Sequence, residues 1–152
     1  MKRSKGTREA QPATPVWTYT QVQRALPYIA SIMQSAREHH IVGERWRVED
    51  ERLAAAPGMP DRSALIAHTE AIREGRLARD RFDEALEELQ ALGIACLDPM
   101  RGEALVPFAN QRKQAWFVYN LFGDQPIRFW RYHSDPVDMR RPIEEILQTT
   151  AV

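Results

Sequence analysis

The chain has 152 residues, of which 43% are hydrophobic, and its 21 lysines and arginines are balanced by 21 aspartates and glutamates. This length and composition suit one domain with a hydrophobic core, while zero net charge removes the simplest argument for a nucleic-acid-binding protein. The lone Cys96 rules out an internal disulfide. No apolar run can span a bilayer and the first residues lack the apolar core of a secretion signal, so we expect a cytoplasmic protein outside the membrane.

The composition changes sharply after the first residues. Residues 1–16 are polar, basic and carry two prolines, so they are expected to be a disordered tail. The alternative is a short electrostatic arm for an acidic partner. The remaining residues, 17–152, are expected to form a single domain, with a helical hairpin at 17–92, a sheet at 93–133, and a C-terminal turn and helix at 134–152.

The first helix of the hairpin has a clear start. Thr18 followed by Gln21 is a capping box, in which each side chain satisfies a backbone amide of the other residue. Pro27 predicts a kink near Gln23 or a restart of the helix at Pro27. The following apolar residues recur with the spacing of a helix packed along another helix, namely Val22, Leu26, Ile29, Met33, Ala36 and His40.

Two prolines and a glycine within residues 57–60 mark the tip of the hairpin. A second helix is predicted for 62–92, and Gly93 is suited to end it in the left-handed conformation. Each helix would be on the order of 45 Å long, which exceeds a small sheet, and both apolar seams are wider than one partner helix needs.

The distal part of the hairpin should therefore project beyond the sheet and expose an apolar patch. We expect this patch to mediate self-association, most simply a two-fold dimer with four helices at its interface, and it could also receive another protein. The alternative is that the helices bend over the sheet. The patch residues are Trp46, Leu53, Leu65 and Ile72.

Residues 93–133 predict an antiparallel sheet. Turn residues such as Asp98-Pro99 and Gly123-Asp124 separate short runs rich in aromatic and branched side chains, and connections this short suit hairpins rather than helical crossovers. The third run is apolar on both faces, so it should be central and partly covered on both sides. With four strands at 94–97, 104–109, 114–122 and 127–133 in a meander, the fold class is α+β, a long helical hairpin packed on a four-stranded sheet.

A short final helix should begin at Pro142, which suits the first helical position. Beside it, a second hypothesis places a small ligand- or metal-dependent enzyme at the edge of the sheet. Arg140 and Arg141, held near Trp130 and His133, would bind a carboxylate or a phosphate. We predict no cofactor and no catalytic residue. A weak alternative is a metal site, but the spacing of its candidate ligands matches no known motif, so we favour structural roles for them in turns and in a strand. These candidate ligands are Asp98, His133 and Asp135.

Other chemistry-bearing residues fit structural roles. His39 and His40 are adjacent on a helix, where side chains diverge by about 100°, and His40 should lie opposite Leu77 rather than His68. Cys96 lies in a buried-looking strand, where a thiol is usually inert. A third hypothesis, a nucleic-acid-binding accessory protein, would stack bases on strand aromatics. We favour a core role for these rings, which are Trp116, Tyr119, Phe129, Trp130 and Tyr132, with Arg112, Lys113, Arg128 and Arg131 nearby.

The chain from Trp17 to Ile143 resembles an uncharacterised bacterial family, domain of unknown function 2203. The resemblance implies a long helical hairpin joined to a small sheet, and no activity. It rests on Trp17-Thr18-Tyr19-Thr20, Leu26-Pro27, Leu92-Gly93, Asp98-Pro99, Gly102, Phe108, Gly123-Asp124, Phe129-Trp130, Arg140 and Pro142-Ile143.

Three positions depart from what the resemblance implies. Pro107 stands where an acidic residue is expected, Arg131 where a histidine is expected, and Asn120 where a tryptophan is common. Any metal binding or proton transfer that depended on that acid and imidazole would be lost here, unless His133 replaces the histidine from the same face of the strand. The favoured function is thus a non-catalytic, self-associating interaction or scaffold protein.

Overall fold

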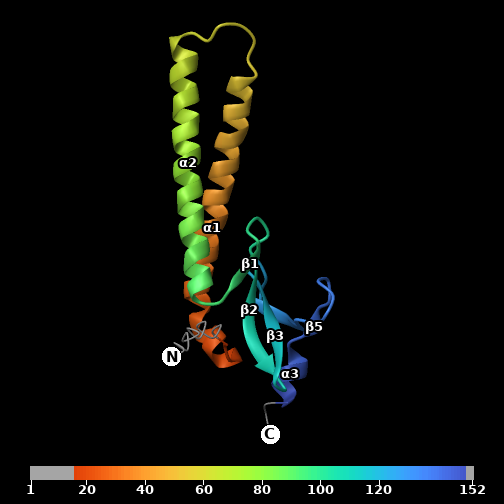
Figure 1. Ribbon diagram of the computed structural model, residues 1–152. Helices are drawn as coiled ribbons and strands as arrows, with labels where there is room; N and C mark the ends of the chain where they lie inside the picture. The colour runs from red at the N-terminus through yellow and green to blue at the C-terminus, as the bar shows by residue number, and fades with distance from the viewer. Residues whose placement is uncertain (1–15, 150–152) are drawn as a thin grey trace, which may run out of the picture.

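The computed structural model describes residues 16–149 and places a long helical hairpin beside an antiparallel sheet (Figure 1). The predicted α+β class is confirmed, although the sheet has five strands rather than four. The predicted tail lies outside the described residues except for Val16. The elements are α1 (Tyr19–Ala54), α2 (Arg62–Ala91), β1 (Ala95–Asp98), β2 (Glu103–Asn110), β3 (Lys113–Asn120), β4 (Ile127–Tyr132), β5 (Arg141–Pro142) and α3 (Glu144–Thr149).

Local capping signals fix the ends of both long helices. The Gln21 amide donates to the Thr18 hydroxyl at 3.2 Å and the Thr18 amide donates to the Gln21 side chain at 3.0 Å, which completes the predicted capping box. Helix α1 continues through Pro27, so the predicted restart there is wrong. At the end of α2, Gly93 has φ of 73°, and the Ile94 amide donates back to the Leu89 carbonyl at 2.9 Å, a left-handed helix cap as expected.

The sheet is a meander in the order β1-β2-β3-β4-β5, and each strand is antiparallel to its neighbour. The unpredicted β5 pairs Pro142 with Phe129 and Arg141 with Trp130. Pro142 is therefore a strand residue and not the first residue of the final helix, which begins at Glu144. A proline is tolerated there because β5 lies at the edge of the sheet.

The hydrophobic core lies between the base of the hairpin and one face of the sheet. Helix α1 contributes Val22, Ile29 and Met33, each fully buried, and Ile143 from the segment before α3 joins the same cluster. Buried side chains from the sheet complete it, namely Ala104, Val106, Phe108, Ala115, Phe117, Tyr119, Ile127 and Trp130. The third strand is thus central, as predicted, and its core face is covered.

The cluster ends at Ala36 on α1 and at Ala85 on α2. Figure 1 shows that both helices continue well past the sheet beyond this point, so the predicted projection of the hairpin is confirmed. We call residues 37–54 and 62–84 the distal hairpin. None of the helices within residues 16–149 combines the length and apolarity needed to cross a lipid bilayer.

Candidate functional site

Small residues form the contact between the two helices of the distal hairpin. Ala71 and Ala78 are the buried residues of α2 in this region. A Cβ added at Gly43 would meet Ala78 at 3.8 Å, and one added at Gly75 would meet the Cβ of Trp46 at 3.4 Å. The helices therefore pack closely at these small residues, and Trp46 is half-buried beside Gly75.

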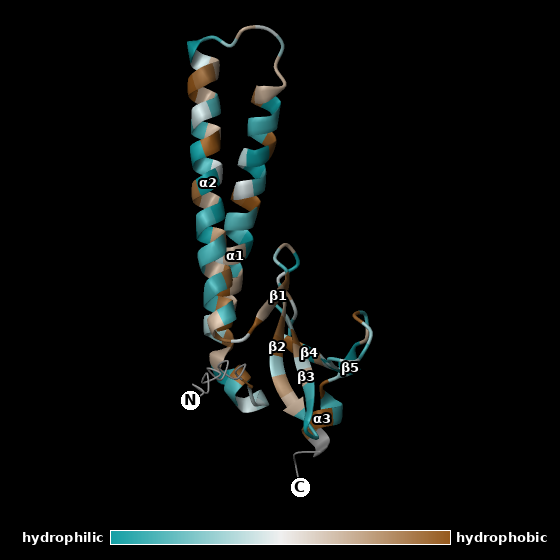
Figure 2. Ribbon diagram, in the orientation of Figure 1, coloured by the Kyte–Doolittle hydropathy of each residue, from teal (hydrophilic) through white to brown (hydrophobic). Residues whose placement is uncertain are grey.

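Large apolar side chains of the distal hairpin lie outside this seam. Leu65 is 54% exposed, Ile66 is 58% exposed and Ile72 is 45% exposed, and Figure 2 shows hydrophobic and hydrophilic segments alternating along both helices above the sheet. Of the four predicted patch residues, Leu65 and Ile72 are exposed, whereas Trp46 and Leu53 are half-buried. The prediction shared the exposed residues between α1 and α2, but the two that are exposed both belong to α2.

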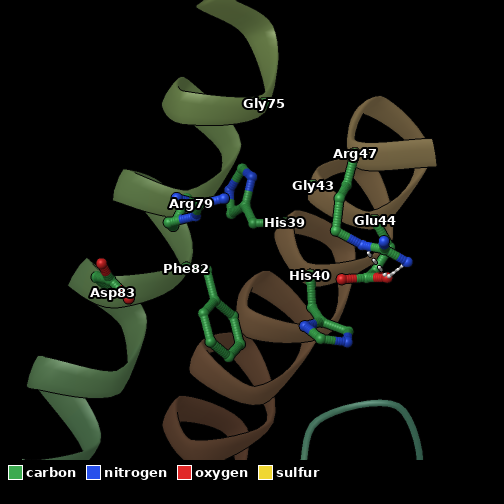
Figure 3. Close-up of a pocket in the computed structure, with 9 residues that line it drawn as sticks. All are labelled: His39, His40, Gly43, Glu44, Arg47, Gly75, Arg79, Phe82 and Asp83. Carbon is green, nitrogen blue, oxygen red and sulfur yellow. Dashed lines mark hydrogen bonds and ion pairs between the residues drawn. The ribbon is translucent and has the colours of Figure 1, made fainter. Parts of the chain in front are cut away.

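A cavity of about 300 Å³ opens between α1 and α2 in the lower part of the distal hairpin (Figure 3). The absence of side chains at Gly43 and Gly75 contributes to this space. His40 contacts Phe82, with 5.4 Å between ring centroids. Phe82 is about one and a half turns along α2 from Leu77, the neighbour predicted for His40. The other lining residues are His39, Glu44, Arg47, Arg79 and Asp83.

The charged residues of this cavity are partly paired. A hydrogen bond from Arg47 lowers the pKa of Glu44, which keeps its carboxylate ionised, and the closest atoms of this ion pair are 3.0 Å apart. Across the hairpin, nearer the tip, Nε2 of His68 lies 2.6 Å from Oδ1 of Asp50. The residues that line the cavity can bind a small polar molecule, but they include no cysteine or serine that could act as a nucleophile.

Of the four predicted ligand-binding residues, the structure brings Trp130 and Arg141 together, whereas His133 and Arg140 have other partners. Trp130 belongs to the core face of the sheet, whereas His133 stacks on Trp116 with ring centroids 4.2 Å apart. Arg140 donates to the carbonyl oxygens of Val137 and Met139 in its own loop, at 2.9 Å each.

Arg141 is held by a carboxylate of the same chain. Its Nε and Nη2 atoms donate to the two carboxylate oxygens of Asp135 at 2.8 and 2.9 Å, and its guanidinium lies over the rings of Trp130 and Tyr132, at 5.5 and 5.1 Å. The Tyr132 amide also donates to Asp135 at 2.9 Å. This cluster joins β4 to β5. We call it the clamp, and in it the Asp135 carboxylate occupies the donors with which Arg141 would bind an external anion.

The candidate ligands of the metal alternative are also far apart. Asp98 caps the turn after β1 by accepting from the Met100 and Arg101 amides, whereas Asp135 follows β4 at the opposite end of the sheet. Across residues 16–149, no group of three or more histidine, cysteine, aspartate or glutamate side chains could hold a metal ion. Burial, with a smaller effect from Asp98, raises the pKa of the Cys96 thiol, so it is a poor nucleophile near neutral pH.

A feature that the sequence analysis missed lies on the sheet face opposite the core. Strand alternation puts Trp116 and Arg131 directly beside one another on this face, and Pro107 is the other neighbour of Trp116. Two of the three departures from the family resemblance therefore lie in one row across the sheet. We call this face the outer face, and it comprises Leu105, Pro107, Trp116, Val118, Phe129, Arg131 and His133.

Comparisons with protein-family models, with curated proteins and with solved structures found no match. Function is therefore argued from the surfaces of this chain. Two features stand out, because the distal hairpin carries exposed apolar side chains, and the outer face carries stacked rings of Trp116 and His133 near the buried Arg131.

Proposed function

We propose that this protein is a non-catalytic interaction component that self-associates through the distal hairpin. The observation that carries the proposal is an inverted distribution of apolar side chains in α2. Its seam with α1 uses Ala71 and Ala78, while Leu65, Ile66 and Ile72 lie outside and remain about half exposed. In a hairpin that functioned alone, large apolar residues would be expected inside the seam.

The exposed residues divide into two flanks of α2. At 3.6 residues per turn, Leu65 and Ile72 lie within about 20° of each other around the helix axis. Ile66 and Leu77 lie within about 20° of each other on the opposite side of the alanine seam. The first pair continues toward Arg79 of the interhelical cavity, at the same heptad spacing.

We assign the Leu65 and Ile72 flank to the dimer interface, with a second copy as its occupant. Two hairpins packed along this flank would form a four-helix arrangement in which both apolar stripes are buried. Arg73 and Glu70 lie on the other flank, and their charges suit a surface that remains in water. We further propose that the chain is a divergent member of the family it resembles, which adds no activity.

Light scattering coupled to size-exclusion chromatography tests the assignment at about 50 µM protein, a range suited to moderately tight association. We expect a dimer for the wild type. The double variant Leu65→Glu with Ile72→Glu should be a monomer, because four buried carboxylates in a dimer would each need a partner.

The matched control is Ile66→Glu with Leu77→Glu, which adds the same charge on the other flank and should remain a dimer. Circular dichroism should show equal helix content in both variants. A monomeric wild type would refute self-association, and a dimer that survives Leu65→Glu with Ile72→Glu would refute the assigned flank.

A further inference from the structure

Arg131 is the buried charged residue of the outer face. The residue is 8% exposed, and the one hydrogen bond that the described residues give its guanidinium is from Nη1 to the Asp135 carbonyl oxygen at 3.3 Å. It forms no ion pair within residues 16–149. The Asp135 carboxylate is close enough for the charge of Arg131 to lower its pKa, but both of its oxygens accept from Arg141, so one carboxylate serves two guanidinium groups. A guanidinium has five N–H donors, and Arg131 uses one of them on the Asp135 carbonyl oxygen, so this group is suited to receive an anion.

Two aromatic residues are near Arg131 on the outer face. Trp116 is the cross-strand neighbour of Arg131, and the His133 imidazole stacks on the Trp116 indole with an interplanar angle of 15°. His133 is exposed, so this two-ring stack ends in a ring that water can reach. Burial and the nearby Arg131 lower the pKa of His133, so its ring is mostly neutral at pH 7 and acts as an aromatic platform.

A second cation extends the same surface. The Arg128 guanidinium lies 5.6 Å from the centroid of the Phe129 ring, and Phe129 is half-buried on the outer face. Arg128 itself is exposed. Arg128 is the residue skipped by the register shift between β3 and β4, and it adjoins the outer face through Phe129, three residues before Arg131. The outer face and this neighbour thus offer a stacking platform and two guanidinium groups, although the chain as a whole carries no net charge.

We propose that the outer face binds single-stranded nucleic acid, with a base stacked on His133 and backbone phosphates held by Arg131 and Arg128. Stacking on aromatic side chains accepts any base, and guanidinium groups form paired hydrogen bonds with phosphate oxygens. A duplex is a poor ligand, because its bases are already stacked on each other. This surface is separate from the distal hairpin, so the inference does not depend on self-association.

Fluorescence anisotropy with labelled twelve-nucleotide oligo(U) and oligo(dT) tests this inference. We expect the wild type to bind one or both strands at micromolar protein, and a duplex of the same length at least tenfold more weakly. Two phosphate contacts predict a slope of about −1.4 in log affinity against log salt, because each contributes roughly 0.7 for a single strand.

Variants separate stacking from charge. His133→Ala should weaken binding at least fivefold because it removes the platform, and His133→Phe should restore it because phenylalanine retains a stacking ring. Arg131→Met keeps the buried stem and should weaken binding while reducing the salt slope. Arg73→Ala, on the distal hairpin, is the matched control for loss of an arginine and should bind like the wild type.

Three results would overturn the inference. The first is no anisotropy change at about 100 µM wild-type protein, the upper end of the Kd range of roughly 1–100 µM that is typical of non-specific binding. The second is equal binding of the duplex or of poly-glutamate, which would indicate charge attraction alone. The third is unchanged affinity in both His133→Ala and Arg131→Met when circular dichroism shows that they are folded.

Discussion

The indole N–H of Trp17 donates to the backbone carbonyl oxygen of Leu92 at 2.8 Å. This bond joins the residue before the N-cap of α1 to the C-cap residue of α2. The backbone amide of Trp17 also donates to the Pro107 carbonyl oxygen in β2 at 2.8 Å. One residue thus fixes the base of the hairpin against the sheet, at the point where the hydrophobic core begins.

Replacing Trp17 with phenylalanine should lower the free energy of unfolding by about 1 kcal/mol, the typical contribution of one hydrogen bond. The loss of ring area adds to this. Urea denaturation followed by circular dichroism measures the change. Trp46→Phe, in the distal seam, controls for the smaller ring, and an equal effect of the two substitutions would argue against the importance of the Leu92 contact.

Two glycines with positive φ should respond differently to alanine. Gly58 has φ of 90° and open space around it, whereas Gly102 has φ of 66° and an added Cβ would lie 2.5 Å from the Cβ of Leu121. Gly58→Ala should cost roughly 1–2 kcal/mol from left-handed strain, and Gly102→Ala should cost an additional 1–3 kcal/mol, roughly, from steric overlap. Thermal unfolding of both variants provides the comparison, and similar Tm values would contradict it.

A glycine in the distal seam offers a stabilising change. Alanine at Gly43 would place its Cβ 3.8 Å from that of Ala78, which is ordinary van der Waals contact. Because glycine is unfavourable inside a helix, Gly43→Ala should raise the free energy of unfolding by about 0.5–1 kcal/mol. Urea titration should show a higher midpoint, and a lower one would mean that the helices cannot accommodate the methyl group.

The Asp135 and Arg141 clamp should make stability sensitive to acid. Hydrogen bonds from Arg141, with the Tyr132 amide contributing, lower the pKa of Asp135 from 3.8 to about 2. A carboxyl group with a lowered pKa in the folded state stabilises the fold above its unfolded pKa, and this contribution is lost as the pH falls toward about 2.

Asp135→Asn should therefore be less stable than the wild type at pH 7, and the difference should shrink as the pH falls from 3.8 toward 2. Urea midpoints measured across this range give the comparison. Asp138→Asn, in the same loop, controls for the loss of a carboxylate. A difference in urea midpoint between the wild type and Asp135→Asn that stays constant with pH would indicate that protonation of Asp135 does not affect stability.

Much of the fold could be predicted from local sequence signals whose physical effect is known. Thr18 and Gln21 marked the start of α1, and Gly93 marked the end of α2, because these residues act on backbone groups within one turn. The predicted third strand was too long because the Asn120 side chain accepts from the Phe122 amide at 2.9 Å and turns the chain there. Strand β5 depends on its distant pairing with Phe129 and on the Asp135 clamp, which no local pattern encodes.

The candidate site was less predictable for a similar reason. Trp130 and His133 were grouped because they are close in sequence, yet they are an odd number of residues apart and so belong to opposite faces of the sheet. The same alternation places Arg131 and His133 together, so strand parity could have identified the outer face. Its partner Trp116 could be found only through the register of β3 with β4.

The end of the hydrophobic cluster at Ala36 and Ala85 has a thermodynamic consequence. Segments with few buried apolar contacts open locally at a lower free energy than the core. Amide protons near the tip should therefore exchange with deuterium sooner than those near Ile29 or Leu89, even though both sets belong to the same two helices. A second copy packed along Leu65 and Ile72 would slow exchange most where the isolated chain opens most easily, so local fluctuation itself would report assembly.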